Sequence, residues 1–352
     1  MPVNPHSKIR VGVAGLGRIG WHFHCKTLAG HPDFDLVAVQ DADEGRLREA
    51  KETYGVATFG RLADMLRSAG LEVVAIATPT HLHREMAGEA LRSGCHVMLE
   101  KPMAASARET EAIVRSAARH GRVLTVYQPH RAAAYFQHLR RILASGKIGQ
   151  VYHVRRGMFN YVRRNDWQSL RRYGGGMLNN YGAHALDQVL QLVGCDVARV
   201  FCSLRRVASL GDADDVAKVL FETRRGSLGE VDINQASAVS PYELQVWGSR
   251  GSITLANGVF GIRYFEEGDL PPKPLDRSLA SANRAYPSDD IPWREETVVV
   301  DAGLEVDVYA DLAAAIRGGR PPLVQAKEAL AVMRLIERCR EDSGRVVRMS
   351  PL

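Results

Sequence analysis

The chain has 352 residues, of which 45% are hydrophobic and 24% are charged; this balance is typical of globular proteins, and the length is sufficient for two domains. The net charge of +6 is uneven, because the stretch from Arg140 to Arg172 holds nine basic residues and one acid, yet no nucleic-acid-binding motif accompanies it. The five cysteines are scattered, which argues against a disulfide framework and a structural zinc site, and no apolar run approaches the ~20 residues of a membrane span.

These observations predict a cytoplasmic protein that binds neither nucleic acid nor a membrane and holds no metal. Residues Met1 to Lys8 lack the apolar segment of a signal peptide. The basic stretch is interpreted first as solvated surface, and an anionic small ligand is the alternative.

Strand-like and helix-like segments alternate from Ile9 to about Gln128. Near-continuous apolar strands that alternate with helices are typical of a parallel sheet covered on both faces. The expected strands are 9–14, 36–40, 73–78, 97–100 and 123–127, and the expected helices are 18–29, 44–53, 82–92 and 106–120, the last with Ser106 as its cap. The sequence therefore predicts a doubly wound Rossmann domain over residues 1–128.

The pattern changes after Gln128. A helix is expected at 177–193, and strands are expected at 151–161, 200–207, 217–222, 227–234, 242–247, 252–255 and 260–265. Such a run of strands predicts a large mixed or antiparallel sheet, and hence an α+β domain over residues 129–352 for substrate binding and oligomerisation. The five prolines of 266–293 indicate a long surface loop. Two closing helices are expected at 304–317 and 325–340, of which the last can pack back on the first domain.

A glycine-rich motif, G-x-G-x-x-G, lies where the first strand meets the first helix. Its glycines allow a tight turn, a close approach of the backbone to a pyrophosphate, and close helix–strand packing, while the helix N-terminus attracts the phosphates. The predicted phosphate-binding residues are Gly15, Gly17, Arg18, Ile19 and Gly20.

Asp41 ends the second strand, 21 residues after Gly20. A carboxylate at this position can accept hydrogen bonds from the adenosine ribose of NAD, and its charge opposes the 2′-phosphate of NADP. Arg46 lies nearby and weakens that preference. The expected cofactor is therefore NAD, with NADP less favoured.

Four motifs follow one another in a characteristic order. They are the glycine motif, the segment 77–83 (ATPTHLH), Glu100-Lys101-Pro102, and the set Gly174-Gly175-Gly176 … Gly182-Ala183-His184 … Asp187. Together they make the whole chain resemble the glucose–fructose oxidoreductase/inositol dehydrogenase/rhizopine catabolism (Gfo/Idh/MocA) family. The resemblance implies an NAD(P)-dependent oxidoreductase that acts on a sugar, a polyol or a sugar derivative, assembled as a homodimer or homotetramer.

The resemblance also implies two catalytic residues. Lys101 follows a parallel strand at the edge where such sheets bind ligands, and it can stabilise negative charge on a substrate oxygen. His184 is the implied acid/base, since the imidazole pKa lies near neutrality. Asn180, His184 and Asp187 share one helical face. The family often has Asp in place of Asn180, which leaves open whether Asn180 orients the imidazole or holds a substrate hydroxyl, and Asp187 is assigned mainly to structure.

Further site residues are expected around this pair. The cofactor is expected to contact Thr78, Pro79, His83, Glu100 and Lys101. The substrate is expected to contact Gln128 and Arg131 after the last Rossmann strand, with Lys101, Asn180 and His184. Arg163, Asp166 and Trp167 are pocket candidates on a loop, for which a purely structural role is an equal alternative; Arg163 or Arg164 could also hold an anionic substrate group, against a surface or interface role.

Two other functions compete with simple dehydrogenation. The first is a lyase or glycosidase that keeps NAD bound and oxidises a sugar only transiently, as some members of the family do. The second is a dinucleotide-binding regulator without enzymatic activity, which the presence of both Lys101 and His184 argues against. Net formation of NADH from a free sugar separates the first alternative from a dehydrogenase.

Overall fold

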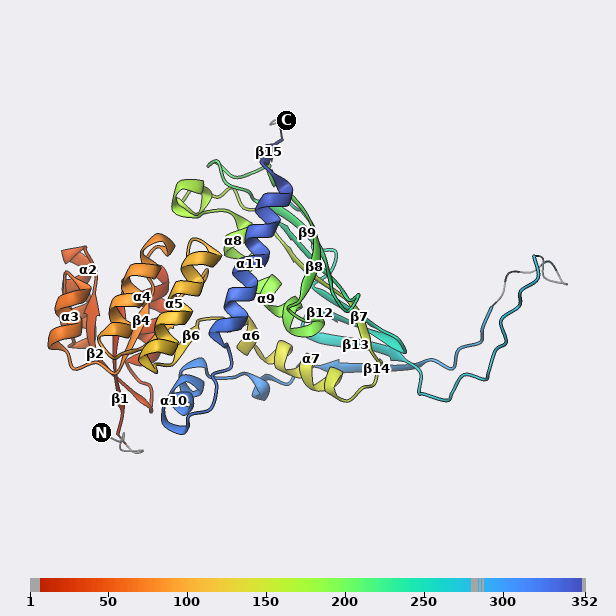
Figure 1. Ribbon diagram of the computed structural model, residues 1–352, viewed down its shortest axis with the longest axis horizontal. Coiled ribbons are helices and arrows are strands. Elements are labelled where there is room, and N and C mark those ends of the chain that lie inside the picture. The colour runs from red at the N-terminus through yellow and green to blue at the C-terminus, as the bar shows by residue number, and fades with distance from the viewer. Residues whose placement is uncertain (1–6, 280–283, 285, 287, 350–352) are drawn as a thin grey trace.

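The computed structural model describes residues 7–279, 284, 286 and 288–349. The chain forms two β-sheets with helices around and between them, and one long segment extends away from the second sheet (Figure 1). Two expectations fall partly outside the described residues: residues 1–6 belong to the segment without a signal peptide, and Pro287 is one of the five prolines of the loop 266–293. No helix in the described part of the chain is both long and apolar enough to cross a membrane.

The first sheet has six parallel strands in the order β3-β2-β1-β4-β5-β6. Its strands are β1 (Ile9–Ala14), β2 (Phe34–Gln40), β3 (Ala57–Phe59), β4 (Val73–Ile76), β5 (His96–Leu99) and β6 (Leu124–Val126). The strand order reverses at β1, and ligands of such sheets bind beyond the carboxyl ends of the strands at this point. The glycine motif, Thr78, Lys101 and Gln128 all follow carboxyl ends along this edge.

Helices cover both faces of this sheet, as the apolar strands require. The helices of the domain are α1 (Lys26–Leu28), α2 (Glu44–Tyr54), α3 (Leu62–Ser68), α4 (His83–Arg92) and α5 (Ala107–His120). Ser106 caps α5 as predicted, since its hydroxyl accepts the Glu109 N–H at 3.1 Å. A late helix, α10 (Val308–Gly318), also packs on the face that carries Val11 and Val13, through Tyr309 and Leu312.

The helix expected at 18–29 differs in its winding. Gly20–Cys25 form a π-helix, η1, before α1 begins. The wider turn changes the rotation of the residues that follow it. His24 lies fully buried in this turn, and both of its ring nitrogens have partners, Tyr309 at 2.6 Å and Glu100 at 3.1 Å. The sequence predicted a continuous α-helix here, whereas the π-helical turn holds His24 buried against Tyr309 and Glu100.

The second sheet has nine strands in the order β14-β13-β12-β11-β7-β10-β9-β8-β15. They are β7 (Val151–Phe159), β8 (Val197–Arg206), β9 (Val216–Thr223), β10 (Leu228–Asn234), β11 (Leu244–Gly248), β12 (Gly251–Ala256), β13 (Val259–Tyr264), β14 (Arg294–Val299) and β15 (Val346–Arg348). Pairing is antiparallel except between β7 and β10 and between β8 and β15, so the predicted mixed α+β domain is confirmed. Strands β3, β14 and β15 were not predicted, because they are short or lie at sheet edges.

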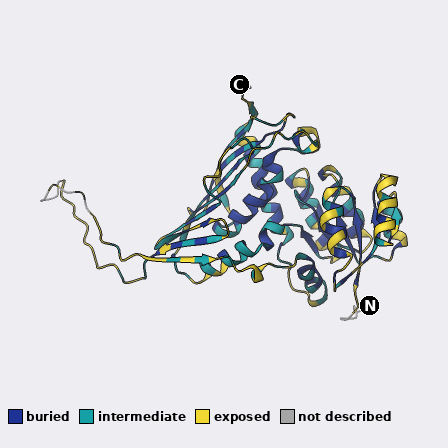
Figure 2. Cartoon of the chain, turned by 180° about the vertical axis from the view of Figure 1, so that it is seen from behind, coloured by how far each residue is buried: buried dark blue, intermediate teal, exposed yellow. Residues whose placement is uncertain are grey.

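One face of this sheet is covered and the other is open. Burial alternates residue by residue along β10, which is typical of a sheet with one covered face. The covering helices are α6 (Pro129–Ala132), α7 (Ala134–Ala144), α8 (Met177–Asn180), α9 (Gly182–Val193) and α11 (Ala326–Ser343). Helix α11 lies between the two sheets, and its buried residues join one core that contains residues of both (Figures 1 and 2). The segment 265–293 joins β13 to β14 and is largely exposed where it is described.

Candidate active site

The glycine motif forms a cradle that side chains would fill. Gly15 has a φ of +93°, and a Cβ there would press on the backbone of Ala77 and Thr78. A Cβ on Gly20 would collide with the Gly15 carbonyl oxygen, whereas nothing lies within 4 Å of a Cβ built on Gly17. The first and third glycines therefore permit the turn and its packing, and the second leaves open space at the helix start. This arrangement fits the phosphates of a dinucleotide.

Asp41 lies beside this cradle and is 9% exposed. Its carboxylate accepts the backbone N–H of Leu16 at 2.7 Å and of Asp43 at 2.9 Å, which fixes it against the glycine turn. Arg46 approaches the same carboxylate at 3.6 Å. Both residues that the sequence linked to the ribose therefore lie together, with the arginine partly compensating the acidic charge.

Lys101 extends from the loop after β5 toward the second domain. Its Nζ donates to Asn180 Oδ1 at 2.7 Å and approaches the Asn180 carbonyl oxygen at 3.3 Å. That carbonyl is available because the predicted helix 177–193 is interrupted here, where the His184 N–H bonds to Tyr181 instead. Burial lowers the pKa of Lys101, and the positive charges of Arg164 and Arg18 lower it further, while Glu100 opposes the shift.

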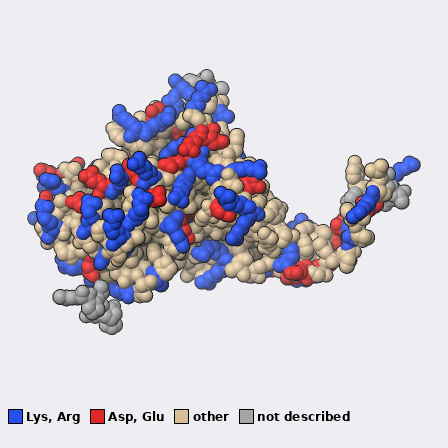
Figure 3. Space-filling view, in the orientation of Figure 1, with Lys and Arg blue, Asp and Glu red and all other residues tan. Residues whose placement is uncertain are grey.

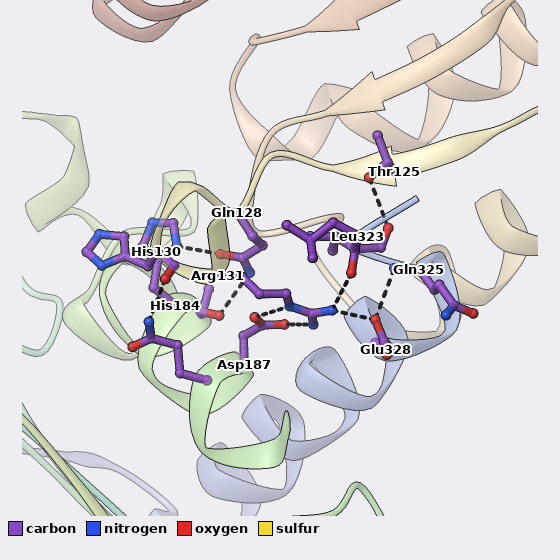
Figure 4. Close-up of polar contacts among 12 residues, drawn as sticks. Thr125, Gln128, His130, Arg131, His184, Asp187, Leu323, Gln325 and Glu328 are labelled. Atoms are coloured by element: carbon purple, nitrogen blue, oxygen red, sulfur yellow. Dashed lines mark hydrogen bonds and ion pairs between the residues drawn. The ribbon is translucent and has the colours of Figure 1, made fainter. Parts of the chain in front are cut away.

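His184 lies on α9 and is 5% exposed. Its Nδ1 is hydrogen-bonded to Oε1 of Gln128, whose side-chain NH₂ donates to the Ala183 carbonyl at 3.0 Å (Figure 4). The amide oxygen can only accept, so His184 carries its proton on Nδ1 and has a free lone pair on Nε2. Burial lowers the pKa of His184 well below its usual value, helped by the charges of Lys101 and His130. At neutral pH, this imidazole is a neutral base.

Arg131 occupies a different place from the one predicted for it. The sequence placed Arg131 in the substrate pocket, but its side chain is 1% exposed and its guanidinium is bound to Asp187, Glu328 and the Leu323 carbonyl (Figure 4). Its contact with Asp187 is bidentate, with one N–H···O distance of 2.8 Å. These partners accept hydrogen bonds from the N–H groups of the guanidinium, so Arg131 supports α9, the helix that carries His184. Asp187 has the structural position expected for it.

Glu100 and His83 also lie behind the edge of the site. Glu100 accepts the backbone N–H of Lys101 at 3.1 Å and is bound to His24. His83 is 1% exposed, and its ring lies between the carbonyl oxygens of Thr78 at 2.8 Å and Pro102 at 3.2 Å. Both side chains therefore join the loops that carry Thr78, Pro79 and Lys101. Their predicted direct contact with the cofactor stays a prediction.

The loop before the triple glycine contributes unevenly. Arg163 is exposed, whereas Arg164 turns inward and is bound to Asp166, at 3.2 Å, and to Gln168. Gln168 Oε1 also lies 3.3 Å from the side-chain nitrogen of Asn180. Trp167 is 45% exposed and lines a small pocket together with Lys101 and Asn180.

Several residues of the site carried no sequence signal of their own. The His130 ring lies beside that of His184, with ring centroids 4.4 Å apart and planes tilted by 31°, and burial lowers the pKa of His130 to about 4. Asp214 comes from the loop between β8 and β9 and accepts the Leu178 N–H at 2.8 Å, so it caps the start of α8. A Cβ on Gly176 would collide with that carboxylate, which explains the glycine there. Only the tertiary structure brings these groups to the motifs.

The comparisons with known proteins agree with this architecture. Residues 9–128 match the family described as an oxidoreductase family with an NAD-binding Rossmann fold, and residues 136–254 match the GFO/IDH/MocA C-terminal domain. The chain therefore belongs to the Gfo/Idh/MocA oxidoreductase family, and its N-terminal domain binds NAD.

Three similar proteins extend these matches. Myo-inositol 2-dehydrogenase of Thermotoga maritima is 28% identical over 71% of this chain and 75% of its own length. The NADP-dependent scyllo-inositol 2-dehydrogenase IolW of Bacillus subtilis is 24% identical over 95% of this chain and 94% of its own. The crystal structure of an NAD-binding protein from Listeria innocua shares the fold, with a TM-score of 0.80 at 24% identity over 96% of this chain and 98% of that one.

Proposed function

We propose that this protein transfers a hydride between NAD and a hydroxyl-bearing carbon of a sugar or polyol, with Lys101 and His184 as the catalytic residues. The observation that carries the proposal is a pair of hydrogen bonds across the domain junction, one between Lys101 and Asn180 and one between His184 and Gln128. A neutral imidazole and a partly buried lysine, each hydrogen-bonded to a residue of the other domain, face the carboxyl edge of an NAD-binding sheet. Dehydrogenase relatives that act on inositols support the substrate class.

In the direction of oxidation, His184 Nε2 accepts the hydroxyl proton. The Nδ1–H bond to Gln128 keeps the lone pair on the other nitrogen, and the lowered pKa keeps the ring unprotonated before reaction. Lys101 donates a hydrogen bond to the same substrate oxygen and stabilises the negative charge that develops on it. In reduction, the same two groups act in reverse, and His184 returns the proton.

The residues of the first domain fit the cofactor. Gly15 to Gly20 would hold its pyrophosphate and Asp41 its adenosine ribose, while Thr78 and Pro79 lie at the carboxyl edge near Lys101. When bound, NAD supplies the hydride acceptor or donor. The protein supplies position, proton transfer and a site partly shielded from water.

The role of Asn180 follows from its contact with Lys101. Where the family often has a carboxylate, this chain holds the lysine with an amide oxygen and a main-chain carbonyl. Two neutral acceptors stabilise the ammonium less than a carboxylate does, so Lys101 keeps a lowered pKa. We assign Asn180 to positioning Lys101, and Gln128 to positioning His184.

The test is a panel of sugars, polyols and inositols, with NAD reduction measured by absorbance. A dehydrogenase forms NADH in proportion to the substrate consumed. Consumption of a sugar derivative without net NADH identifies the lyase or glycosidase alternative. Failure of every compound to reduce NAD, together with no change in any compound, would contradict an enzymatic function of this kind.

A further inference from the structure

An arginine-lined cavity of about 350 Å³ adjoins the candidate active site. It lies between the loops after β4 and β5, the triple glycine, and the C-terminal end of α11. Thr80, Pro102, Gly174, Gly175 and Asn179 line both this cavity and the smaller pocket at Lys101, so the two spaces are neighbours. The volume lies within the range of small-molecule sites, ~300–1,000 Å³.

The cavity wall is strongly basic. Arg171, Arg172, Arg340 and Arg345 line it, and Asp214 is the one carboxylate among its lining residues. Asp214 is 8% exposed, and its carboxylate already accepts the Leu178 N–H at the start of α8. None of the four arginines has an ion pair with an acidic side chain in the described part of the chain. Basic side chains gather at the top of the molecule, around the C-terminal end (Figure 3).

One of these arginines is held in place from behind. Arg340 is partly buried on α11 and donates to the side-chain oxygen of Asn179, the residue next to Asn180. Arg171 and Arg172 follow the loop of Trp167, and Arg345 lies just beyond the end of α11. The four arginines come from two stretches of the chain, 171–172 and 340–345, and all of them line the cavity. Such an arrangement suits the several oxygen atoms of a phosphate group.

We propose that this cavity binds a phosphate-bearing part of the substrate, so that the substrate is a sugar phosphate or a nucleotide-linked sugar. The inference rests on the proposed function, since the sugar ring must reach Lys101 and His184 while its phosphate lies among the arginines. It differs from the anionic site considered at Arg163 and Arg164. Neither of those two arginines lines the cavity, and Arg164 is bound to Asp166 and Gln168.

The experiment measures binding to the NAD-saturated protein by calorimetry, because bound NAD blocks the glycine cradle against other phosphates. The probes are glucose, glucose 6-phosphate and UDP-glucose. We expect at least one phosphorylated probe to bind tenfold or more tightly than glucose, with an affinity that falls as salt increases. Tighter binding of glucose 6-phosphate points to a phosphomonoester, and tighter binding of UDP-glucose points to a diphosphate.

Three variants locate the site. Arg340→Ala, and separately the exposed Arg171→Ala and Arg345→Ala, should weaken the phosphorylated probe about 10- to 100-fold, the scale of hydrogen bonds to charged groups. The exposed variants keep the test valid if Arg340→Ala fails to fold. Arg224→Ala is the matched control, because Arg224 is an exposed arginine in the turn after β9, at the opposite end of that strand from Asp214.

Two results would overturn the inference. The first is equal affinity for glucose and both phosphorylated probes, and the second is a loss of affinity in all three cavity variants that is no larger than the loss in Arg224→Ala. The outcome is separable from the proposed function. NAD reduction by neutral polyols with no preference for phosphate refutes the cavity inference alone. Phosphate binding that depends on Arg171 and Arg345, without NAD reduction by any sugar, refutes the dehydrogenase proposal and leaves the binding site standing.

Discussion

The two sides of the candidate active site are held in a reciprocal way. Lys101 belongs to the Rossmann domain, but its amino group is bound by Asn180 of the second domain. His184 belongs to the second domain, but its ring is bound by Gln128 at the end of the Rossmann domain. Each group is therefore in position only when the two domains are joined.

The supports behind the two groups differ in chemistry. Behind Lys101, Glu100 is bound to His24, and His24 to Tyr309 of α10. Behind His184, a buried arginine joins Asp187 to Glu328 of α11. Both chains of contacts end on C-terminal helices, so the last part of the sequence fixes both halves of the site. The His184 side depends on a fully buried guanidinium–carboxylate ion pair, and it should be the more sensitive of the two to the loss of one partner.

The largest effect is expected from breaking that buried ion pair. Asp187→Leu leaves Arg131 buried with only Glu328 to compensate it, and should lower the free energy of unfolding by about 3–5 kcal/mol. Urea unfolding monitored by circular dichroism measures the loss. Arg131→Met combined with Asp187→Leu should recover part of it. Arg199→Ala, which breaks an exposed pair with Glu222, should cost about 1 kcal/mol or less; an equal cost in Asp187→Leu contradicts the buried-pair interpretation.

The second prediction removes the two reacting groups. Lys101→Ala and His184→Ala should each lower kcat by ~10²-fold or more, the scale of acid–base and oxyanion-stabilising residues. NAD affinity, measured by titration, should change little because neither side chain is expected to hold the phosphates. Near-normal turnover in either variant would show that the substituted residue has no catalytic role and that only one domain supplies a catalytic residue.

The third prediction sharpens the comparison by exchanging amides for carboxylates. In Gln128→Glu, a negative charge beside His184 stabilises the protonated ring and raises its pKa. The neutral base is then lost at a higher pH, so the acid limb of the kcat/KM profile should move up by about one unit. The basic limb should stay in place.

The matching exchange on the other side is Asn180→Asp. A carboxylate beside Lys101 raises its pKa, so the ammonium persists to higher pH and the basic limb should move up by about one unit. Here the acid limb should stay in place. Movement of the same limb in both variants would show that the two positioning residues act on a single group, and would end the reciprocal interpretation.

The smallest effect is expected at the adenosine ribose of the cofactor. Asp41→Ser removes the carboxylate that favours ribose hydroxyls and opposes a 2′-phosphate, so it should narrow the preference for NAD over NADP about tenfold. Dissociation constants for both cofactors measure this, with Arg46→Ala as the converse variant that should weaken NADP. A wild-type preference for NADP contradicts the assignment. Neither variant should alter the pH profile.

The sequence alone was sufficient for the motifs and the domain types. Local patterns determine strands and turns, so the Rossmann sheet and the mixed second sheet were predicted from short segments and are confirmed. The tight turn expected at Gly15 to Gly20 is present, while its binding of phosphates stays a prediction. The positions of Asp41 and Lys101 at strand ends follow from the same local pattern, because all strands of a parallel sheet end at one edge. The order of the motifs also sufficed to identify the family.

Only the tertiary structure decided which partner each side chain takes. The sequence left open whether Asn180 orients the imidazole or holds a substrate hydroxyl. In the folded chain Asn180 binds Lys101, 79 residues away, and the imidazole is hydrogen-bonded to Gln128 instead. Arg131 was expected to face the substrate and lies instead between two acids of α9 and α11. A hydrogen-bond partner is chosen by the packing of whole elements against one another, and local sequence patterns carry no information about contacts over such separations.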